Sequence, residues 1–184
     1  MSQPQPPRPA KLVIGVLTGD PALFPGVAAE LEAAFGSIDI VSPWLPFGYT
    51  RYYEREMGAT LQRRVLAFTP LIEQDRLPAV KSATNALERG RMAKGRRRVN
   101  IDPGYLLLER FVLASGKNHA HRIYLGHGIY ADLTLVFQRG DFRPLPWTYP
   151  DYADNPLRRF LCAVRQKYDL ELNALHTPGP AEPS

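Results

Sequence analysis

The spacing of hydrophobic residues along the chain predicts a fold that combines strands with helices. Residues 11–17 form a β-branched apolar run of strand length, and residues 59–68 alternate with the period of two that strands have. Apolar residues recur at helical spacing in two segments that end at Gly36 and Gly90, and glycine is common just after a helix. The predicted elements are strands at 11–17, 38–41, 59–68, 98–101 and 106–115, a hairpin at 121–137, and helices at 27–35, 50–57, 77–90 and 157–168.

The order of these elements predicts an α+β architecture. The first part reads strand, helix, strand, strand, helix, strand, which suits a ferredoxin-like βαββαβ start. We expect later antiparallel strands to extend this unit into one mixed sheet, with helices on one side and a closing C-terminal helix. A chain of 184 residues normally forms one domain. We therefore expect a single α+β domain at 11–172 between disordered, proline-rich tails at 1–10 and 173–184.

The segment HRIYLGHGIYADLTL, at 121–135, contains the clearest candidate site. Gly128 lies where a three-residue hairpin loop, closed by Leu125 and Ile129, needs a positive φ. This register predicts one apolar face and one polar face, and the polar face consists of Arg122, Tyr124, Tyr130, Asp132 and Thr134. Planar donors and acceptors on so short a surface are typical of a site for a polar ligand. The alternative is a solvated face on which the arginine and the aspartate form an ion pair contributing roughly 0.2–1 kcal/mol.

Polar residues also gather on the predicted helix at 77–90 and on the strand that follows it. One stripe of this helix consists of Lys81, Thr84, Asn85 and Glu88. Asn100 and Asp102 lie one strand step apart, so their side chains share one side, just before a turn predicted at Asp102-Pro103-Gly104. Asp102 is a candidate to bind magnesium or a ribose hydroxyl. The alternatives are a solvated helix face and an aspartate that only organises the turn.

Two aromatic segments add further candidates. In WTYPDY, at 147–152, the residues placed to rim a pocket are Tyr149, Asp151 and Tyr152, and the alternative is that the segment anchors the final helix. In YYEREMG, at 52–58, packing is the simpler interpretation, with Glu54 and Glu56 as further candidates for a general base.

Positive charge is concentrated in one loop. The chain has a net charge of +5, and six cations without an acid lie between Arg89 and Arg98. Such a loop is either simply solvated or a contact for RNA phosphates. Its GxxxxG spacing continues with Arg96-Arg97 and follows a helix, so it is not a P-loop. We expect no DNA partner.

Composition limits the class of protein. No apolar run approaches the roughly 20 residues that a membrane-spanning helix needs. The single cysteine, Cys162, cannot form an internal disulfide, which agrees with a reducing compartment. We therefore expect a soluble cytoplasmic protein without a membrane partner. The four histidines come with no cysteine pair and no HExxH motif, so we expect no zinc site.

Several motifs together carry a family resemblance, namely YYEREMG, KSATNALE, RVNIDPGYL, FVLASGKNHAHRIYLGHGIYADLTL and WTYPDY. In series they resemble the uncharacterised bacterial and archaeal family called domain of unknown function 4416, from roughly Lys11 to Tyr168. Some members of that family are labelled GTP-binding proteins, although this chain has neither a P-loop nor an NKxD motif. The polar positions that match the family are Lys81, Thr84, Asn85, Glu88, Asn100, Asp102, Tyr105, Ser115, Lys117, His121, Arg122, Tyr124, Tyr130, Asp132, Thr134, Tyr149, Asp151 and Tyr152.

The expected function is the binding of a small phosphorylated ligand, a nucleotide above all, with GTP as one candidate. Arginine and lysine would contact phosphate, and tyrosines would form a stacking surface. The candidate ligand-binding residues are Lys81, Asn85, Asn100, Tyr105, Lys117, His121, Arg122, Tyr124, Tyr130 and Thr134. The candidate catalytic residues are Glu88, Asp102 and Asp132, of which Asp102 and Asp132 are also candidate ligands for magnesium.

Three interpretations of the function stay open. If the protein is an enzyme, these carboxylates with magnesium would support phosphoryl or nucleotidyl transfer. A second interpretation is an RNA-associated binding protein that uses the basic loop at 89–98. The third is a non-catalytic structural or interaction protein whose polar residues only satisfy one another.

Overall fold

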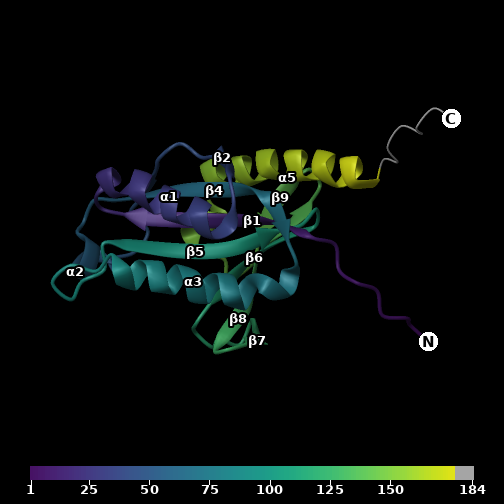
Figure 1. Cartoon of the computed structure of the whole chain (residues 1–184), viewed down its shortest axis with the longest axis horizontal. Helices are drawn as coiled ribbons and strands as arrows, with labels where there is room; N and C mark the ends of the chain where they lie inside the picture. Colours follow the sequence, from purple (N-terminus) through teal and green to yellow (C-terminus); the bar gives the residue numbers. More distant parts are fainter. Residues whose placement is uncertain (177–184) are drawn as a thin grey trace.

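One open sheet of nine strands organises the chain in this computed structural model, which describes residues 1–176 (Figure 1). The strands are β1 (Ala10–Thr18), β2 (Ile38–Val41), β3 (Leu45–Phe47), β4 (Leu61–Ile72), β5 (Val99–Leu106), β6 (Arg110–Ser115), β7 (Arg122–Gly126), β8 (Ile129–Gln138) and β9 (Asp141–Pro144). Their order is β2-β4-β1-β5-β6-β8-β7, with β3 beside β4 and β9 beside β8. The α+β class and the single sheet are therefore confirmed. All strand pairs among these residues are antiparallel, whereas we had predicted a mixed sheet.

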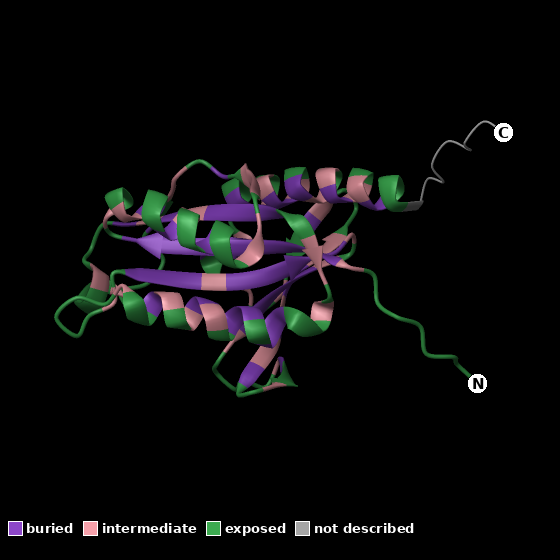
Figure 2. Ribbon diagram, viewed as in Figure 1, coloured by how far each residue is buried: buried purple, intermediate pink, exposed green. Residues whose placement is uncertain are grey.

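Helices cover both faces of the sheet, not one face as predicted (Figures 1 and 2). The helices are α1 (Phe24–Phe35), α2 (Glu54–Met57), α3 (Leu77–Gly90), α4 (Pro150–Ala153) and α5 (Asn155–His176), with short 3₁₀ turns at Pro21–Leu23 and Gln74–Arg76. Neighbouring residues of β1 point to opposite faces, since side chains alternate along a strand. Ile14 packs with Val27 of α1, whereas Val13 belongs to the cluster that contains Leu161 of α5.

The ends of the chain differ in part from the predicted tails. Helix α5 continues to His176, so residues 173–176 are helical. The rest of the predicted C-terminal tail, 177–184, lies outside the described residues. Among the helices of residues 1–176, none combines the length and the apolar character needed to cross a membrane.

Strand β5 runs straight through the Asp102-Pro103-Gly104 segment that we had predicted as a turn. Strand β6 pairs only with the last part of β5, from Gly104 to Leu106, so residues 99–103 have no strand on that side. Proline lacks an N–H donor and is tolerated where no neighbouring strand needs one. At Gly104, a Cβ atom would lie 2.4 Å from the carbonyl oxygen of Val112, so glycine allows β6 to approach. The chain reverses after β5 instead, at residues 107–109.

Helix α3 completes the part of β5 that β6 leaves open. The Ile101 N–H donates to Glu88 Oε1 at 2.7 Å, and Lys81 Nζ donates to the Ile101 carbonyl at 2.8 Å. Side chains thus replace the missing strand as hydrogen-bond partners, which a buried backbone requires. The polar stripe of α3 is therefore buried at Lys81, Thr84 and Glu88, and the solvated-face interpretation is wrong.

The hairpin of β7 and β8 has the predicted register, with Arg122 opposite Asp132. Its loop differs from the prediction. Gly126 pairs with Ile129, and His127 and Gly128 both have positive φ, as a two-residue type I′ turn requires. A bulge at Leu125 compensates for the shorter loop and keeps the register. The burial is also reversed, because the polar pair is buried while the apolar Ile123 is 69% exposed.

Candidate functional site

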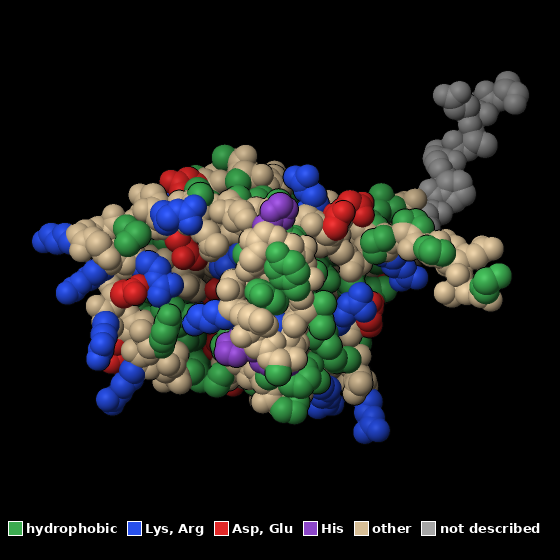
Figure 3. All heavy atoms as spheres, turned by 90° about the horizontal axis from the view of Figure 1, so that it is seen from below, with side chains coloured by type: hydrophobic (Ala, Val, Ile, Leu, Met, Phe, Trp, Pro, Cys, Tyr) green, Lys and Arg blue, Asp and Glu red, His purple; other side chains and the backbone are tan. Residues whose placement is uncertain are grey.

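A cavity of about 580 Å³ opens where β5 and β6 separate. Its walls come from strands β4, β5, β6 and β8, helices α3 and α4, and the segment at 47–53. Figure 3 shows basic and acidic side chains mixed around a hollow in one face of the molecule. The volume lies within the roughly 300–1,000 Å³ that is usual for small-molecule sites. Seven of the predicted site residues line the cavity, namely Lys81, Asn85, Glu88, Asn100, Asp102, Lys117 and Asp132.

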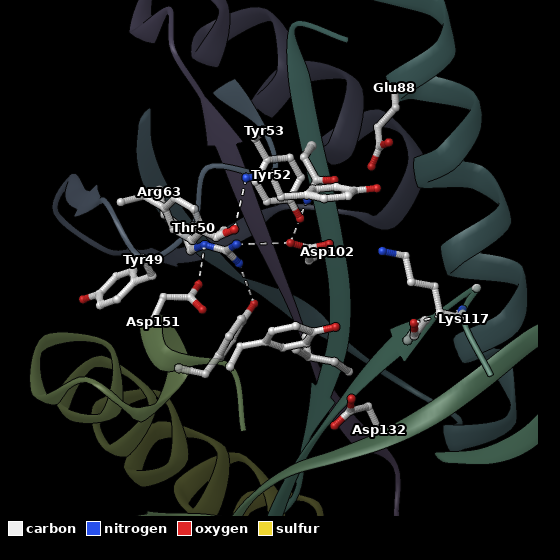
Figure 4. Close-up of a pocket in the computed structure, with 18 of the residues that line it drawn as sticks. Tyr49, Thr50, Tyr52, Tyr53, Arg63, Glu88, Asp102, Lys117, Asp132 and Asp151 are labelled. Atoms are coloured by element: carbon white, nitrogen blue, oxygen red, sulfur yellow. Dashed lines mark hydrogen bonds and ion pairs between the residues drawn. The ribbon is translucent and has the colours of Figure 1, made fainter. Parts of the chain in front are cut away.

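The inner end of the cavity is organised by Arg63, a residue of β4 that the sequence analysis missed. Its side chain is buried and forms ion pairs with Asp151 at 2.9 Å and Asp102 at 3.3 Å. It also donates to the Tyr152 hydroxyl at 3.0 Å (Figure 4). A Cβ atom at Gly15 would lie 3.0 Å from both the guanidinium and this hydroxyl, so a larger residue would force these two groups to shift. The guanidinium therefore fixes two carboxylates and one phenol around a single cation.

Burial and charge oppose each other in this cluster. Burial is the largest single contribution and acts to lower the pKa of the Arg63 guanidinium, but the charges of Asp151, Tyr152 and Asp102 together outweigh it, and the net shift is upward. Burial also raises the pKa of the Asp151 carboxyl, although Arg63 acts to lower it. We infer that Arg63 stays positively charged.

The signal for Arg63 was present in the sequence. Along β4, Leu61, Arg63 and Val65 point to the same face, and the apolar neighbours are buried. A charged residue at an inward position of an alternating strand needs a buried partner, which marks it as unusual.

Further polar lining residues that we had not listed as ligand-binding or catalytic candidates include Tyr49, Thr50, Tyr52, Tyr53 and Arg97. The four residues at 49–53 come from the segment that we had interpreted as loop and packing. The cavity lining also includes three residues of the WTYPDY segment, Tyr149, Asp151 and Tyr152. We had named these residues as candidates for the rim of a pocket. Glu54 and Glu56, our outside candidates for a general base, are not among the lining residues, and Glu56 pairs with Arg97.

Arg122 does not line the cavity, although we had expected it to contact phosphate. Its guanidinium is buried and donates to Asp132 at 2.9 Å and to Ser115 Oγ at 2.7 Å. It also donates to the Lys117 carbonyl at 2.9 Å and to the Tyr149 hydroxyl at 2.6 Å. Arg122 thus supports the cavity wall from behind, and neither the phosphate role nor the solvated ion pair describes it.

The remaining predicted site residues lie outside the cavity lining; they are Tyr105, His121, Tyr124, Tyr130 and Thr134. Tyr105 belongs to the hydrophobic core, and burial raises the pKa of its hydroxyl. Thr134 is buried and donates to the Asp132 carbonyl. His121 stacks on Trp147 at 5.1 Å between ring centroids, and Tyr124, which lies beside Tyr130 in the hairpin, is 60% exposed. The stacking surface that we had expected in the hairpin is therefore not part of the cavity.

Lys117 lies between the two sides of the cavity. Its Nζ lies 4.7 Å from the centre of the Tyr52 ring, and its backbone N–H donates to Ser115 Oγ at 3.1 Å. Among residues 1–176 its ammonium group makes no ion pair. Gly116 beside it also lines the cavity and has open space where a Cβ would be. A cation and an accessible backbone therefore meet at this wall.

The basic loop between α3 and β5 is partly neutralised by acids. Arg91 pairs with Glu30 at 2.7 Å, and Arg98 pairs with Asp20 at 2.9 Å. Lys94 has a positive φ and lies in a tight turn that the Ala93–Arg96 bridge closes. RNA binding by this loop stays a prediction.

Asp102 and Asp132, the predicted magnesium ligands, lie on different strands and each has an arginine partner. In the described part of the chain, no three or more histidine, cysteine, aspartate or glutamate side chains come close enough to hold a metal ion. The magnesium site stays a prediction, and we derive no step from it.

Comparison with known proteins identifies a family but no function. The family model described as Domain of unknown function (DUF4416) matches residues 8–168, so the chain belongs to this family. No curated protein and no solved structure matches the chain.

Proposed function

We propose that this member of the family binds a small phosphorylated ligand of nucleotide size in the cavity between β5 and β6. The observation that carries the proposal is the ammonium group of Lys117, which extends into the cavity without an acidic partner among residues 1–176 (Figure 4). The lining arginines differ, because Arg63 and Arg97 are each paired with carboxylates. Lys81 also lines the cavity without an ion pair among these residues, but its ammonium group donates to the Ile101 carbonyl at 2.8 Å. An incoming anion would therefore find in Lys117 a cation that needs no prior separation from an acid.

Aromatic rings that line the cavity support the proposal that the ligand is a nucleotide, because a nucleotide contains a planar base. Tyr49, Tyr52, Tyr53 and Tyr149 line the cavity. A tyrosine ring offers a planar surface for a base, and stacking of this kind contributes about 1–3 kcal/mol per base. A nucleotide combines a ring with phosphate, so it suits a cavity that has tyrosines and the ammonium group of Lys117. Asn85 and Asn100 add amide groups that can orient such a ligand.

The test is a binding panel measured first by thermal shift and then by calorimetry. The probes are ATP, GTP, adenosine, guanosine and pyrophosphate, each with and without magnesium. We expect nucleotides to raise the melting temperature more than the nucleosides do, because only nucleotides carry phosphate. Lys117→Ala should weaken nucleotide binding by about 10- to 100-fold, which corresponds to a charge-assisted hydrogen bond of roughly 1.5–3 kcal/mol.

The matched control is Arg89→Ala, which removes an exposed positive charge that does not line the cavity. It should leave the affinity unchanged. The proposal is wrong if none of these probes binds, or if Arg89→Ala and Lys117→Ala weaken binding equally.

A further inference from the structure

We propose that Glu88 is the proton-exchanging carboxyl of this cavity: it takes up one proton when an anionic ligand binds and then donates a hydrogen bond to that ligand. This inference rests on the proposed function, because it needs an anion in the cavity. It assigns to α3 a role in recognition that differs from that of Lys117.

The four carboxyl groups that line the cavity differ in their partners. Asp102 and Asp151 both pair with Arg63, and Asp132 pairs with Arg122. In the part of the chain that the structure describes, Glu88 alone among the four makes no ion pair. An arginine beside a carboxylate stabilises its charged form. Each of the three aspartates thus has a guanidinium partner, which Glu88 lacks among the described residues.

The carboxyl group of Glu88 is buried against the backbone of β5. Its side chain is 9% exposed, and one oxygen accepts the Ile101 N–H at 2.7 Å. Lys81, two helical turns away, donates to the Ile101 carbonyl rather than to Glu88. In Figure 4 the carboxyl group of Glu88 points into the cavity from α3, toward the space that Lys117 enters from the opposite side.

Charged side chains from α3, from β5 and from the segment before β5 surround Glu88. Lys81 on α3, the Ile101 N–H and Arg97 before β5 act to lower its pKa, and Asp102 on β5 acts to raise it. Burial is the largest contribution, and the net effect raises the pKa of Glu88. Lys117 and Asp132 line the wall beyond.

The surroundings of Glu88 determine how charge and protons balance when an anionic ligand binds. A phosphate group that enters the cavity adds negative charge near Glu88, which disfavours a second anion. Glu88 therefore takes a proton from solvent, and its neutral form has an O–H that can donate to a ligand oxygen. The oxygen that accepts from Ile101 keeps its partner throughout.

A test without ligand follows the carboxyl carbon of Glu88 by NMR as the pH changes, with Glu88→Gln to assign the signal. We expect a midpoint above the ordinary glutamate value of about 4.3. A midpoint at or below that value would overturn the inference.

A test with ligand uses calorimetry with GTP and ATP in two buffers of different ionisation enthalpy, at a pH above the Glu88 midpoint. The wild-type chain should take up about one proton per ligand, since Glu88 is then ionised before binding and neutral after it. Glu88→Gln should still bind but take up none. The control Glu54→Gln changes an acid outside the cavity lining and should retain the uptake.

The outcomes separate this inference from the proposed function. Binding that depends on Lys117 without proton uptake in the wild-type chain overturns the role of Glu88 and leaves the proposed function in place. If no probe binds, both fail together. Uptake that persists in Glu88→Gln assigns the proton to another group and overturns the inference.

Discussion

Two buried ion clusters lie on the same sheet in the described part of the chain, and only one of the two lines the 580 Å³ cavity. In the first, Lys11 of β1 is completely buried and pairs with Asp39 at 2.8 Å and with Glu171 of α5 at 2.7 Å. In the second, Arg63 of β4 pairs with Asp102 and Asp151. Each cluster places one strand cation between two acids from other parts of the chain.

The surroundings of the two clusters differ more than their chemistry does. None of the three Lys11-cluster residues lines the large cavity, and this cluster joins α5 to the edge of the sheet. All three charged residues of the Arg63 cluster line the cavity. A buried ion pair is weak evidence for function by itself, because such pairs also serve only structure. The adjoining space and the unpaired Lys117 distinguish the second cluster.

Among the changes that compare the two clusters, Arg63→Met should have the largest effect on stability. This variant keeps much of the side-chain volume but leaves the carboxylates of Asp102 and Asp151 without their cation. Breaking a buried pair in this way should lower the free energy of unfolding by about 3–5 kcal/mol, measured by urea denaturation. Adding Asp151→Asn to the variant should recover part of that loss. A loss below about 1 kcal/mol, the range of surface pairs, would show that the cluster is not effectively buried.

Lys11→Met should have a smaller effect on stability and none on binding at the cavity. Asp39 keeps Lys167 as a partner, and the Glu171 side chain is 24% exposed, so water can compensate. We expect a loss of about 1–3 kcal/mol in the free energy of unfolding. Nucleotide affinity of the folded protein should be unchanged. A loss of affinity equal to that of Arg63→Met would remove the distinction between the two clusters.

The smallest effect should be a pH dependence of stability that comes from Glu88. Because burial raises its pKa in the folded state, the folded protein binds this proton more tightly than the unfolded chain does. Stability should therefore be lost as the pH rises from the unfolded value of about 4.3 through the raised folded value. Glu88→Gln lacks this loss, so the wild-type chain should become less stable relative to the variant over that range. Parallel stability profiles of the two proteins would contradict the raised pKa.

The periodic spacing of hydrophobic residues predicted most of the helices and strands. Helix α3 was predicted with its observed bounds, and Gly36 follows α1 as expected. The segment at 102–104 was misinterpreted, because Asp-Pro-Gly usually makes a turn. A strand accepts that sequence only where its neighbour diverges, and this depends on the tertiary arrangement of β5 and β6.

The candidate site was predictable where the sequence spacing fixes a side-chain direction. The helical stripe of Lys81 and Glu88 and the strand pair Asn100 and Asp102 do converge at the cavity. The place of Arg122 was not predictable in this way. The sequence correctly predicted which face of the hairpin carries Arg122. The groups that contact Arg122 on that face belong to the 115–117 and 147–149 segments, whose positions depend on the tertiary fold.

The most direct test of the cavity as a nucleotide site is a two-dimensional amide NMR titration with GTP or ATP at constant ionic strength. We predict that the amide signals of Ile101, Gly116 and Lys117 shift with one common affinity, while those of Ile123 and Leu125 at the hairpin end stay in place. The contradicting result is a set of shifts confined to the basic loop at 91–98, with the cavity signals unchanged.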